Sequence, residues 1–181
     1  MKNLIVLFLL CFVLGCNTVE KNKLAVLTGN NLQAVEFLNQ SVYLPAGFQP
    51  VHKEDNEAAA EYLANFDANS VLFVDRQNGV NSITFMPADY TKLSKPLINY
   101  DVNDLERHFS KEGLAMQRLE AKMLRYGSAE IIKIKYLQAL EEAQAYITQY
   151  VVSHDLETYI ILVRHQENQD VLAILKSTFN V

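Results

Sequence analysis

The chain has 181 residues, of which 50% are hydrophobic, and a formal net charge of −5. This length suits one domain of ordinary size, with enough apolar side chains to bury a core without disulfides. The acidic balance argues against nucleic acid as a partner and against attachment through a polybasic membrane patch, because both require a basic surface.

The amino-terminal segment has the layout of an export signal. Lys2 gives the positive region, residues 4–14 (LIVLFLLCFVL) are all apolar, and Gly15 is a small residue at the expected cleavage position. As a helix, the apolar run would extend about 17 Å, which is too short to cross about 30 Å of hydrocarbon. We therefore expect a signal peptide over residues 1–15 and no permanent transmembrane helix there.

The four residues VLGC at 13–16 resemble the lipobox of bacterial lipoproteins. In that family the cysteine becomes the first mature residue and carries a diacylglyceryl thioether, usually with an amide-linked acyl chain such as palmitate. Leucine is commoner than valine at the first of these positions. The resemblance implies lipidation of Cys16 and firm attachment to a membrane, because two or more acyl chains hold a protein where one does not. An ordinary secretory signal with a chance cysteine is the alternative.

Cysteine usage and the following residues bound the rest of the chain. The two cysteines are Cys11, within the signal, and Cys16, at the lipid site, so no other thiol is available for a disulfide or a metal. Asn17 follows the lipid site, and by analogy with enteric bacteria the absence of aspartate there favours the outer membrane over the inner. We expect the lipidated cysteine and a tether over residues 16–31 and one domain over residues 32–181.

The amino-terminal half of the domain predicts strands and one helix. Residues 55–66 carry apolar side chains on one helical face and predict the helix, whereas residues 32–39 are ambiguous between helix and strand. Asn78-Gly79 predicts a hairpin, because both residue types tolerate a positive φ. Segments rich in β-branched and aromatic residues between turn signals predict strands at residues 41–44, 48–51, 71–75 and 82–86.

A long helix is expected in the middle of the chain. Residues 87–100 contain two prolines and predict a connection. Asp101 is suited to cap a helix, and apolar residues recur at helical spacing over residues 102–126. Gly113 would bend or split this helix, and Gly127 is placed to end it.

The last third predicts three strands and a terminal helix. Apolar and charged residues alternate over residues 132–136, so we expect one buried face and one solvated face. Residues 143–152 and 158–163 predict a hairpin, and the second strand is apolar on both faces, as in the centre of a sheet. Residues 168–178 predict an amphipathic helix. Together the elements predict an α+β fold, a mainly antiparallel sheet with helices packed against it.

The order of several segments resembles the PsbP/DcrB-like fold, whose bacterial members include small envelope lipoproteins. The segments are VYLPAGF at 42–48, the strand around residues 145–146, YIIL at 159–162 and the helix ending near residues 177–179. The resemblance covers residues 35–181 and implies an α+β sandwich. It also implies an accessory or interaction protein, and it transfers no active-site residue.

No residue pattern identifies a catalytic, cofactor-binding or metal-binding site. No Walker, dinucleotide or nucleophile-elbow motif is present, and nothing selects a catalytic pair among the carboxylates. The turns around His52 and His154 could hold a metal weakly, but turns are polar in any case. None of the four histidines has a zinc-ligand spacing: they are His52, His108, His154 and His165. Four tyrosines on neighbouring predicted strands fit either sheet packing or a groove for a peptide or lipid: Tyr136, Tyr146, Tyr150 and Tyr159.

The sequence therefore predicts a protein of the bacterial cell envelope, anchored to the membrane through a lipid on Cys16 and placed in the periplasm or at the cell surface. We expect it to bind another envelope protein without catalysing a reaction, and we expect no cofactor. One alternative is a carrier that holds a small lipid or peptide in an apolar pocket between the sheet and the helix expected at residues 101–126. An enzyme is the least favoured alternative.

Overall fold

The computed structural model describes residues 32–37, 40–55, 57–64, 66–89, 93–139, 144–154 and 157–167. The signal peptide, the tether and the helix expected at residues 168–178 lie outside these ranges. Within them, no helix combines the length and the apolar composition needed to cross a bilayer.

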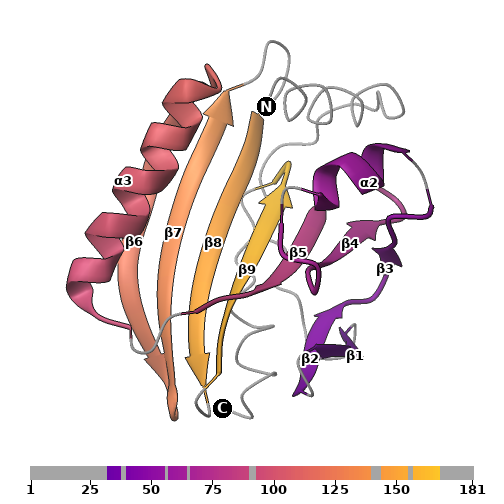
Figure 1. Cartoon of the computed structure of the whole chain (residues 1–181), viewed down its shortest axis with the longest axis horizontal. Helices are drawn as coiled ribbons and strands as arrows, with labels where there is room; N and C mark the ends of the chain where they lie inside the picture. Colours follow the sequence, from indigo (N-terminus) through magenta and orange to yellow (C-terminus); the bar gives the residue numbers. More distant parts are fainter. Residues whose placement is uncertain are drawn as a thin grey trace.

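Seven strands form one antiparallel sheet in the order β3-β4-β5-β9-β8-β7-β6 (Figure 1). Their bounds are β3 Phe48–Val51, β4 Val71–Asp75, β5 Ser82–Pro87, β6 Met116–Tyr126, β7 Ala129–Ala139, β8 Gln144–His154 and β9 Glu157–His165. The strand expected to be central, β9, lies in the middle of the sheet, because its apolar residues need cover on both faces. A second antiparallel pair, β1 Leu32–Phe37 and β2 Gln40–Pro45, forms a separate small sheet.

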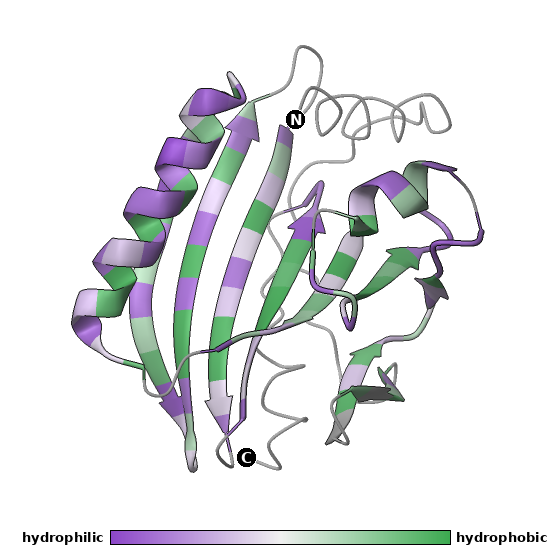
Figure 2. Cartoon of the chain, viewed as in Figure 1, coloured by the Kyte–Doolittle hydropathy of each residue, from purple (hydrophilic) through white to green (hydrophobic). Residues whose placement is uncertain are grey.

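Two helices, α2 Glu57–Leu63 and α3 Lys95–Lys111, cover one face of the large sheet. α3 lies along β6 and β7, and Figure 2 shows its hydrophobic stripe beside hydrophilic residues. α2 is fixed by Tyr62, whose hydroxyl oxygen lies 3.1 Å from Thr84 Oγ1 on β5. Residues that pair directly across neighbouring strands lie on the same face of a sheet. Thr84 pairs with Leu162, Leu162 pairs with Gln149, and Gln149 pairs with Ile134. Ile134 packs with α3, so Thr84 lies on the face that α3 covers. Both helices therefore lie on the same side.

The β1–β2 pair packs on the opposite face of the sheet, against β5 and β9. Phe37 of β1 packs against Phe85 and Tyr159, with ring centroids 5.3 Å and 6.0 Å away. Val42 and Leu44 of β2 join the same buried cluster and are 2% and 0% exposed. The molecule is thus a sandwich with one core on each face of the large sheet.

The long helix expected over residues 101–126 is wrong in position and length. α3 begins after Ser94 and has Pro96 in its first turn. Proline is accepted there because a backbone N–H in the first turn has no partner within the helix, so its absence costs no hydrogen bond. Asp101 is therefore a buried residue inside the helix and not its cap. Gly113 ends the helical region with a φ of +68°, a left-handed conformation that favours glycine.

Residues expected to continue that helix form β6 instead. β6 pairs with β7 along its length, with a bulge between Arg118 and Glu120 that adds one residue to β6. Before the bulge Met116 shares a face with Arg118, and after it Met123 takes that face. The extra residue shifts the strand alternation by one position, so the apolar spacing imitates a helix.

Other expectations on local structure were met with changes of detail. The ambiguous residues 32–39 contain a strand, and the expected helix at 55–66 is shortened to α2. The β4–β5 hairpin is confirmed, but Gly79 does not adopt a positive φ. Asn78 shapes this connection instead, because its side-chain oxygen accepts a hydrogen bond from the Val80 backbone at 3.2 Å.

Candidate functional site

A buried polar cluster lies on the face of the large sheet opposite α3. We define this cluster as Glu120 of β6, Lys133 and Lys135 of β7, Tyr146 of β8 and His165 of β9. In the strand register Glu120 lies directly opposite Lys135, and Tyr146 lies directly opposite His165. Neighbouring strands therefore bring these residues to one face of the sheet. Charged groups are rarely buried without partners, which makes this cluster the most distinctive polar feature of the described sheet.

The solvated face expected for residues 132–136 is wrong. Lys133 and Lys135 are only 4% and 7% exposed, although they alternate with apolar residues in the sequence. β7 has β6 on one side and β8 on the other, and its Lys133 side shares a face with the core cluster at Ile131. The long aliphatic stems of lysine allow such burial if the ammonium group finds partners.

Glu120 is a partner for Lys133. Lys133 Nζ lies 2.8 Å from Glu120 Oε2, and Lys122 pairs with the other oxygen of the same carboxylate. Burial acts to raise the pKa of Glu120, but the hydrogen bonds and charges of Lys122 and Lys133 outweigh it and hold this pKa below its ordinary value. Glu120 is therefore a carboxylate at neutral pH and bridges two lysines.

Lys135 makes a different contact. Its ammonium nitrogen lies 5.2 Å from the centroid of the Tyr146 ring, within the range of a cation–π interaction. Tyr146 is half-buried and lies directly across from His165. The cluster therefore continues from β7 through β8 to the end of β9.

His165 is the most deeply buried histidine that the structure describes, with 3% of its surface exposed. Within the described ranges neither ring nitrogen has a hydrogen-bond partner, and the ring centroid lies 6.3 Å from that of Phe48. Burial lowers the pKa of His165 to about 4; the negative charge of Asp75 opposes this shift, and the positive charge of Lys135 adds to it. His165 is thus neutral at pH 7.

The other histidines lie apart from this cluster. His52 is exposed after β3, and its backbone N–H donates to Asp55 Oδ2 at 2.7 Å, which is ordinary turn chemistry. His108 is exposed on α3, and His154 ends β8 opposite Glu157. Across the described ranges, no three His, Cys, Asp or Glu side chains gather as a set of metal ligands.

The four tyrosines occupy neighbouring strands as expected, but they do not share a face. Tyr136 lies beneath α3, with its ring centroid 5.1 Å from that of Phe109. Tyr150 and Tyr159 lie in the core of the opposite face and are each 1% exposed. Burial, followed by the charge of Glu106, raises the pKa of Tyr136 to about 12. Three of the four tyrosines therefore act as packing residues.

The side chains between α3 and β7 bury one another. Val102 and Phe109 of α3 are 3% and 9% exposed, and Ile132 and Ile134 of β7 are both 0% exposed. The carrier alternative placed its pocket between the sheet and a helix at residues 101–126. The second half of that region is the strand β6 and not part of a helix that covers the sheet. Cys16, the expected lipid site, lies outside the described residues.

Sequence reasoning missed the buried polar cluster because its members are ordinary surface residue types. Lysines alternating with isoleucines are typical of a half-solvated strand. The signal that was available is the apolar composition of β8, which predicts a strand buried on both faces beside β7. The partner Glu120 was assigned to a helix, so its place opposite β7 was not predicted.

No family model matches the sequence, and no curated protein matches it. Solved structures do match. Cyanobacterial PsbP (CyanoP) from Synechocystis sp. PCC 6803 is 12% identical with a TM-score of 0.54, and the match covers 90% of this chain and 93% of that one. This likeness shows the fold: the chain has the PsbP-like α+β architecture, a mainly antiparallel sheet with helices packed against it.

Two other solved structures are similar to a lesser degree. The Ran-binding protein Mog1p of Saccharomyces cerevisiae is 13% identical with a TM-score of 0.47, over 76% of this chain and 78% of that one. The protein PA94 of Pseudomonas aeruginosa, a putative regulator of unknown function, is 10% identical with a TM-score of 0.41, over 83% and 92%. We draw the fold from the cyanobacterial structure alone.

Proposed function

We propose that the chain is a lipoprotein of the bacterial cell envelope that binds another envelope protein and catalyses no reaction. The observation that carries the first part is the segment 4–16, an apolar run too short to span a bilayer that ends in Gly15-Cys16. Acyl chains on Cys16 would supply the attachment that the run itself is too short to give. The outer membrane is the favoured location, because Asn17 follows the cysteine.

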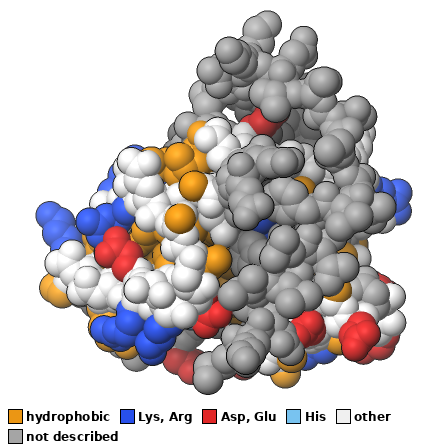
Figure 3. Space-filling model, turned by 90° about the horizontal axis from the view of Figure 1, so that it is seen from above, with side chains coloured by type: hydrophobic (Ala, Val, Ile, Leu, Met, Phe, Trp, Pro, Cys, Tyr) orange, Lys and Arg blue, Asp and Glu red, His pale blue; other side chains and the backbone are white. Residues whose placement is uncertain are grey.

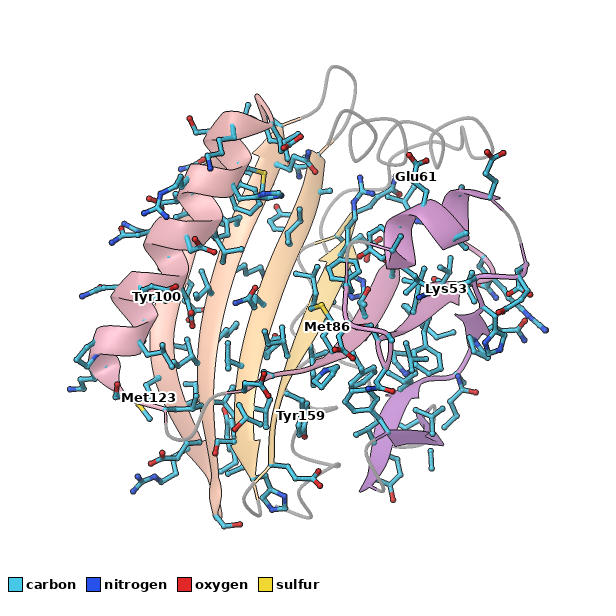
Figure 4. All side chains as sticks on the ribbon, viewed as in Figure 1. Lys53, Glu61, Met86, Tyr100, Met123 and Tyr159 are labelled. Carbon is cyan, nitrogen blue, oxygen red and sulfur yellow. The ribbon has the colours of Figure 1, made fainter. Side chains whose placement is uncertain are left out.

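The binding role is supported by the character of the domain. Its sequence has no catalytic motif, and its fold is that of the cyanobacterial PsbP structure. Among the residues that the structure describes, two large hydrophobic side chains are exposed, Tyr100 of α3 at 65% and Leu119 of β6 at 44%. Figure 4 labels Tyr100 on α3, and Figure 3 shows hydrophobic side chains beside acidic and basic ones on the face seen from above. A mixed surface of this kind suits a protein partner.

Metabolic labelling with a palmitate analogue tests the anchor. The wild-type chain is expected to incorporate label and to fractionate with membranes, whereas Cys16→Ala is expected to do neither. Cys11→Ala is the matched control, because it removes the other cysteine but leaves the expected lipid site, so its label should remain. Label that persists in Cys16→Ala, or is lost only in Cys11→Ala, contradicts the anchor.

Site-specific photo-crosslinking in intact cells tests the binding role. A photoreactive amino acid at Tyr100 is expected to give a discrete crosslink to one envelope protein. The same amino acid at Asn103, which is exposed on the same helix, is the position control. Stoichiometric lipid or peptide in solvent extracts of the purified chain, together with no protein crosslink, would favour the carrier alternative instead.

A further inference from the structure

The strand β3 lies at the edge of the large sheet and accepts a hydrogen bond from the Gln33 side chain of β1 at its Phe48 carbonyl oxygen. It has four residues, includes Pro50, and pairs with β4 along one side. Its first residue, Phe48, is 5% exposed and contacts the ring of His165 at the end of β9. Short edge strands are among the first parts of a protein to open locally. The contact between Phe48 and His165 therefore joins an edge strand of the sheet to its central strand.

The surroundings of His165 suit the neutral imidazole and not the imidazolium ion. Both nitrogens of an imidazolium ion are donors, yet in the described part of the chain neither nitrogen of His165 has an acceptor, and the residue is 3% exposed. A charged group buried in this way is strongly disfavoured. Because opening would hydrate the ring, protonation and opening are coupled.

Of the charged side chains that the structure describes, Asp75 and Lys135 act on His165. Asp75 of β4 attracts a proton to the ring and Lys135 of β7 repels one. The carboxylate of Asp75 already accepts hydrogen bonds from the Gln77 backbone at 2.9 Å and from the Asn81 side chain at 3.3 Å. β3 and β5 carry no titratable side chain, the only one on β8 besides its tyrosines is His154 at the far end, and Arg164 of β9 lies on the opposite face.

We propose that His165 is an acid-sensitive latch, whose protonation releases β3 from the sheet while the rest of the sheet stays folded. Release uncovers Phe48 and the end of β9, and it alters the turn that connects β3 to β2. The latch is independent of the lipid anchor and of any binding partner.

Hydrogen exchange on the full chain in detergent tests this proposal, with rates divided by the intrinsic exchange rate at each pH. The pKa of His165 is about 4 when β3 is closed and is expected near its ordinary value when β3 is open. The equilibrium constant for opening of β3 should therefore rise about 20-fold between pH 7 and pH 5. We expect that rise in the amides of β3 and at the end of β9. The amides of β7 and β8 should keep their protection.

Three variants decide the origin of the effect. His165→Phe and His165→Gln cannot protonate, and both should show less than about a 2-fold change between the two pH values. Two replacements are used so that failure of the phenylalanine variant to fold leaves the glutamine variant as the test. His154→Gln, at the other end of the sheet, should behave as the wild type. Equal opening of β3 at both pH values in the wild type, or the wild-type rise in His165→Gln, overturns the latch.

Discussion

Glu120 and Lys133 form an ion pair across β6 and β7, with 2.8 Å between Nζ and Oε2 and only 6% of the Lys133 side chain exposed. The lysine is held inside the sheet face that carries one of the two cores of the molecule. Ion pairs of this kind add little net stability compared with apolar residues, but removal of one partner leaves a charge in a place that water does not reach.

Asymmetric effects are expected from the two partners. Glu120→Gln should lower the free energy of unfolding by about 1–2 kcal/mol, because Lys133 loses its carboxylate, whereas Lys133→Met should change it by less than about 1 kcal/mol. Urea unfolding followed by circular dichroism measures both. Glu130→Gln is the control: it breaks a pair with Arg125, whose side chain is 71% exposed, and should have an effect of about 0.5 kcal/mol or less. Equal losses from all three changes would contradict the role of burial.

Acid should remove the contribution of Glu120. Its folded-state pKa is depressed, so the stabilisation is present above the ordinary pKa of 4.5 and is lost as the pH falls through the lower, folded-state value. The stability of the Glu120→Gln variant should therefore fall less than that of the wild type as the pH drops below about 4.5. Parallel pH curves for the two proteins would show that the depressed pKa is not realised.

Tyr136 holds α3 to the sheet mainly through its ring. Its hydroxyl group lies 3.4 Å from Glu106 Oε1, a long hydrogen bond, whereas the ring packs edge-on against Phe109. Tyr136→Phe should thus lower the stability by about 1 kcal/mol or less, and Tyr136→Ala by about 3–4 kcal/mol. Thermal unfolding measures the difference, and similar losses for the two would assign the stability to the hydroxyl group.

The alkaline titration of Tyr136 gives a second readout at the same place. Its pKa is raised to about 12, so the stabilisation is present below pH 10 and is lost as the pH rises towards 12. Glu106→Gln removes one negative charge that raises this pKa. The phenolate of Tyr136, resolved by NMR from those of the other tyrosines, should therefore form at lower pH in the variant than in the wild type, and an unchanged titration would contradict the contact.

Gly113 and Gly79 should respond differently to the same substitution. Gly113 has a φ of +68°, so Gly113→Ala forces a left-handed conformation that costs about 1–2 kcal/mol. Gly79 has an ordinary φ and no atom within 4 Å of an added Cβ, so Gly79→Ala should be neutral or slightly stabilising. Chemical denaturation compares them, and equal effects would show that the backbone at Gly113 is not restricted.

Phe37 should control the attachment of the β1–β2 pair. Phe37→Ala removes contacts with Phe85 and Tyr159 and should lower the stability by about 3 kcal/mol. Limited proteolysis should then cut within β1 and β2 before the large sheet. Tyr100→Ala is the control, because that side chain is 65% exposed and its loss should leave both readouts close to those of the wild type. Early cleavage in the control would contradict the assignment.

Much of the sheet could be predicted because its signals are local. The strands β2, β4, β5 and β9 are apolar or β-branched runs bounded by turn residues, and such runs predict strands without information from the rest of the chain. The region from α3 to β6 could not be predicted in this way. The segment around Pro96 was predicted to be a connection, although the first turn of a helix accepts proline. The bulge in β6 shifts the alternation of apolar residues, so the strand pattern could not be recognised.

The buried polar cluster depends on information that no short segment contains. Lys133 is buried because its side of β7 shares a face with the core cluster at Ile131, and among the described residues the His165 ring nitrogens have no hydrogen-bond partner. Register between strands decides which side chains meet, and register is set by the whole sheet. Sequence patterns therefore predicted the fold class but not the cluster.

Both ends of the seven-stranded sheet stop further growth of the sheet. β3 carries Pro50, which has no N–H to offer a new strand, and β6 carries a bulge with charged residues around it. These are devices that proteins use against edge-to-edge polymerisation. Proteins confined to a membrane surface meet one another far more often than in free solution, as tethered partners do. For a chain anchored as we propose, blocked edges would keep crowded neighbours from assembling into a continuous fibre.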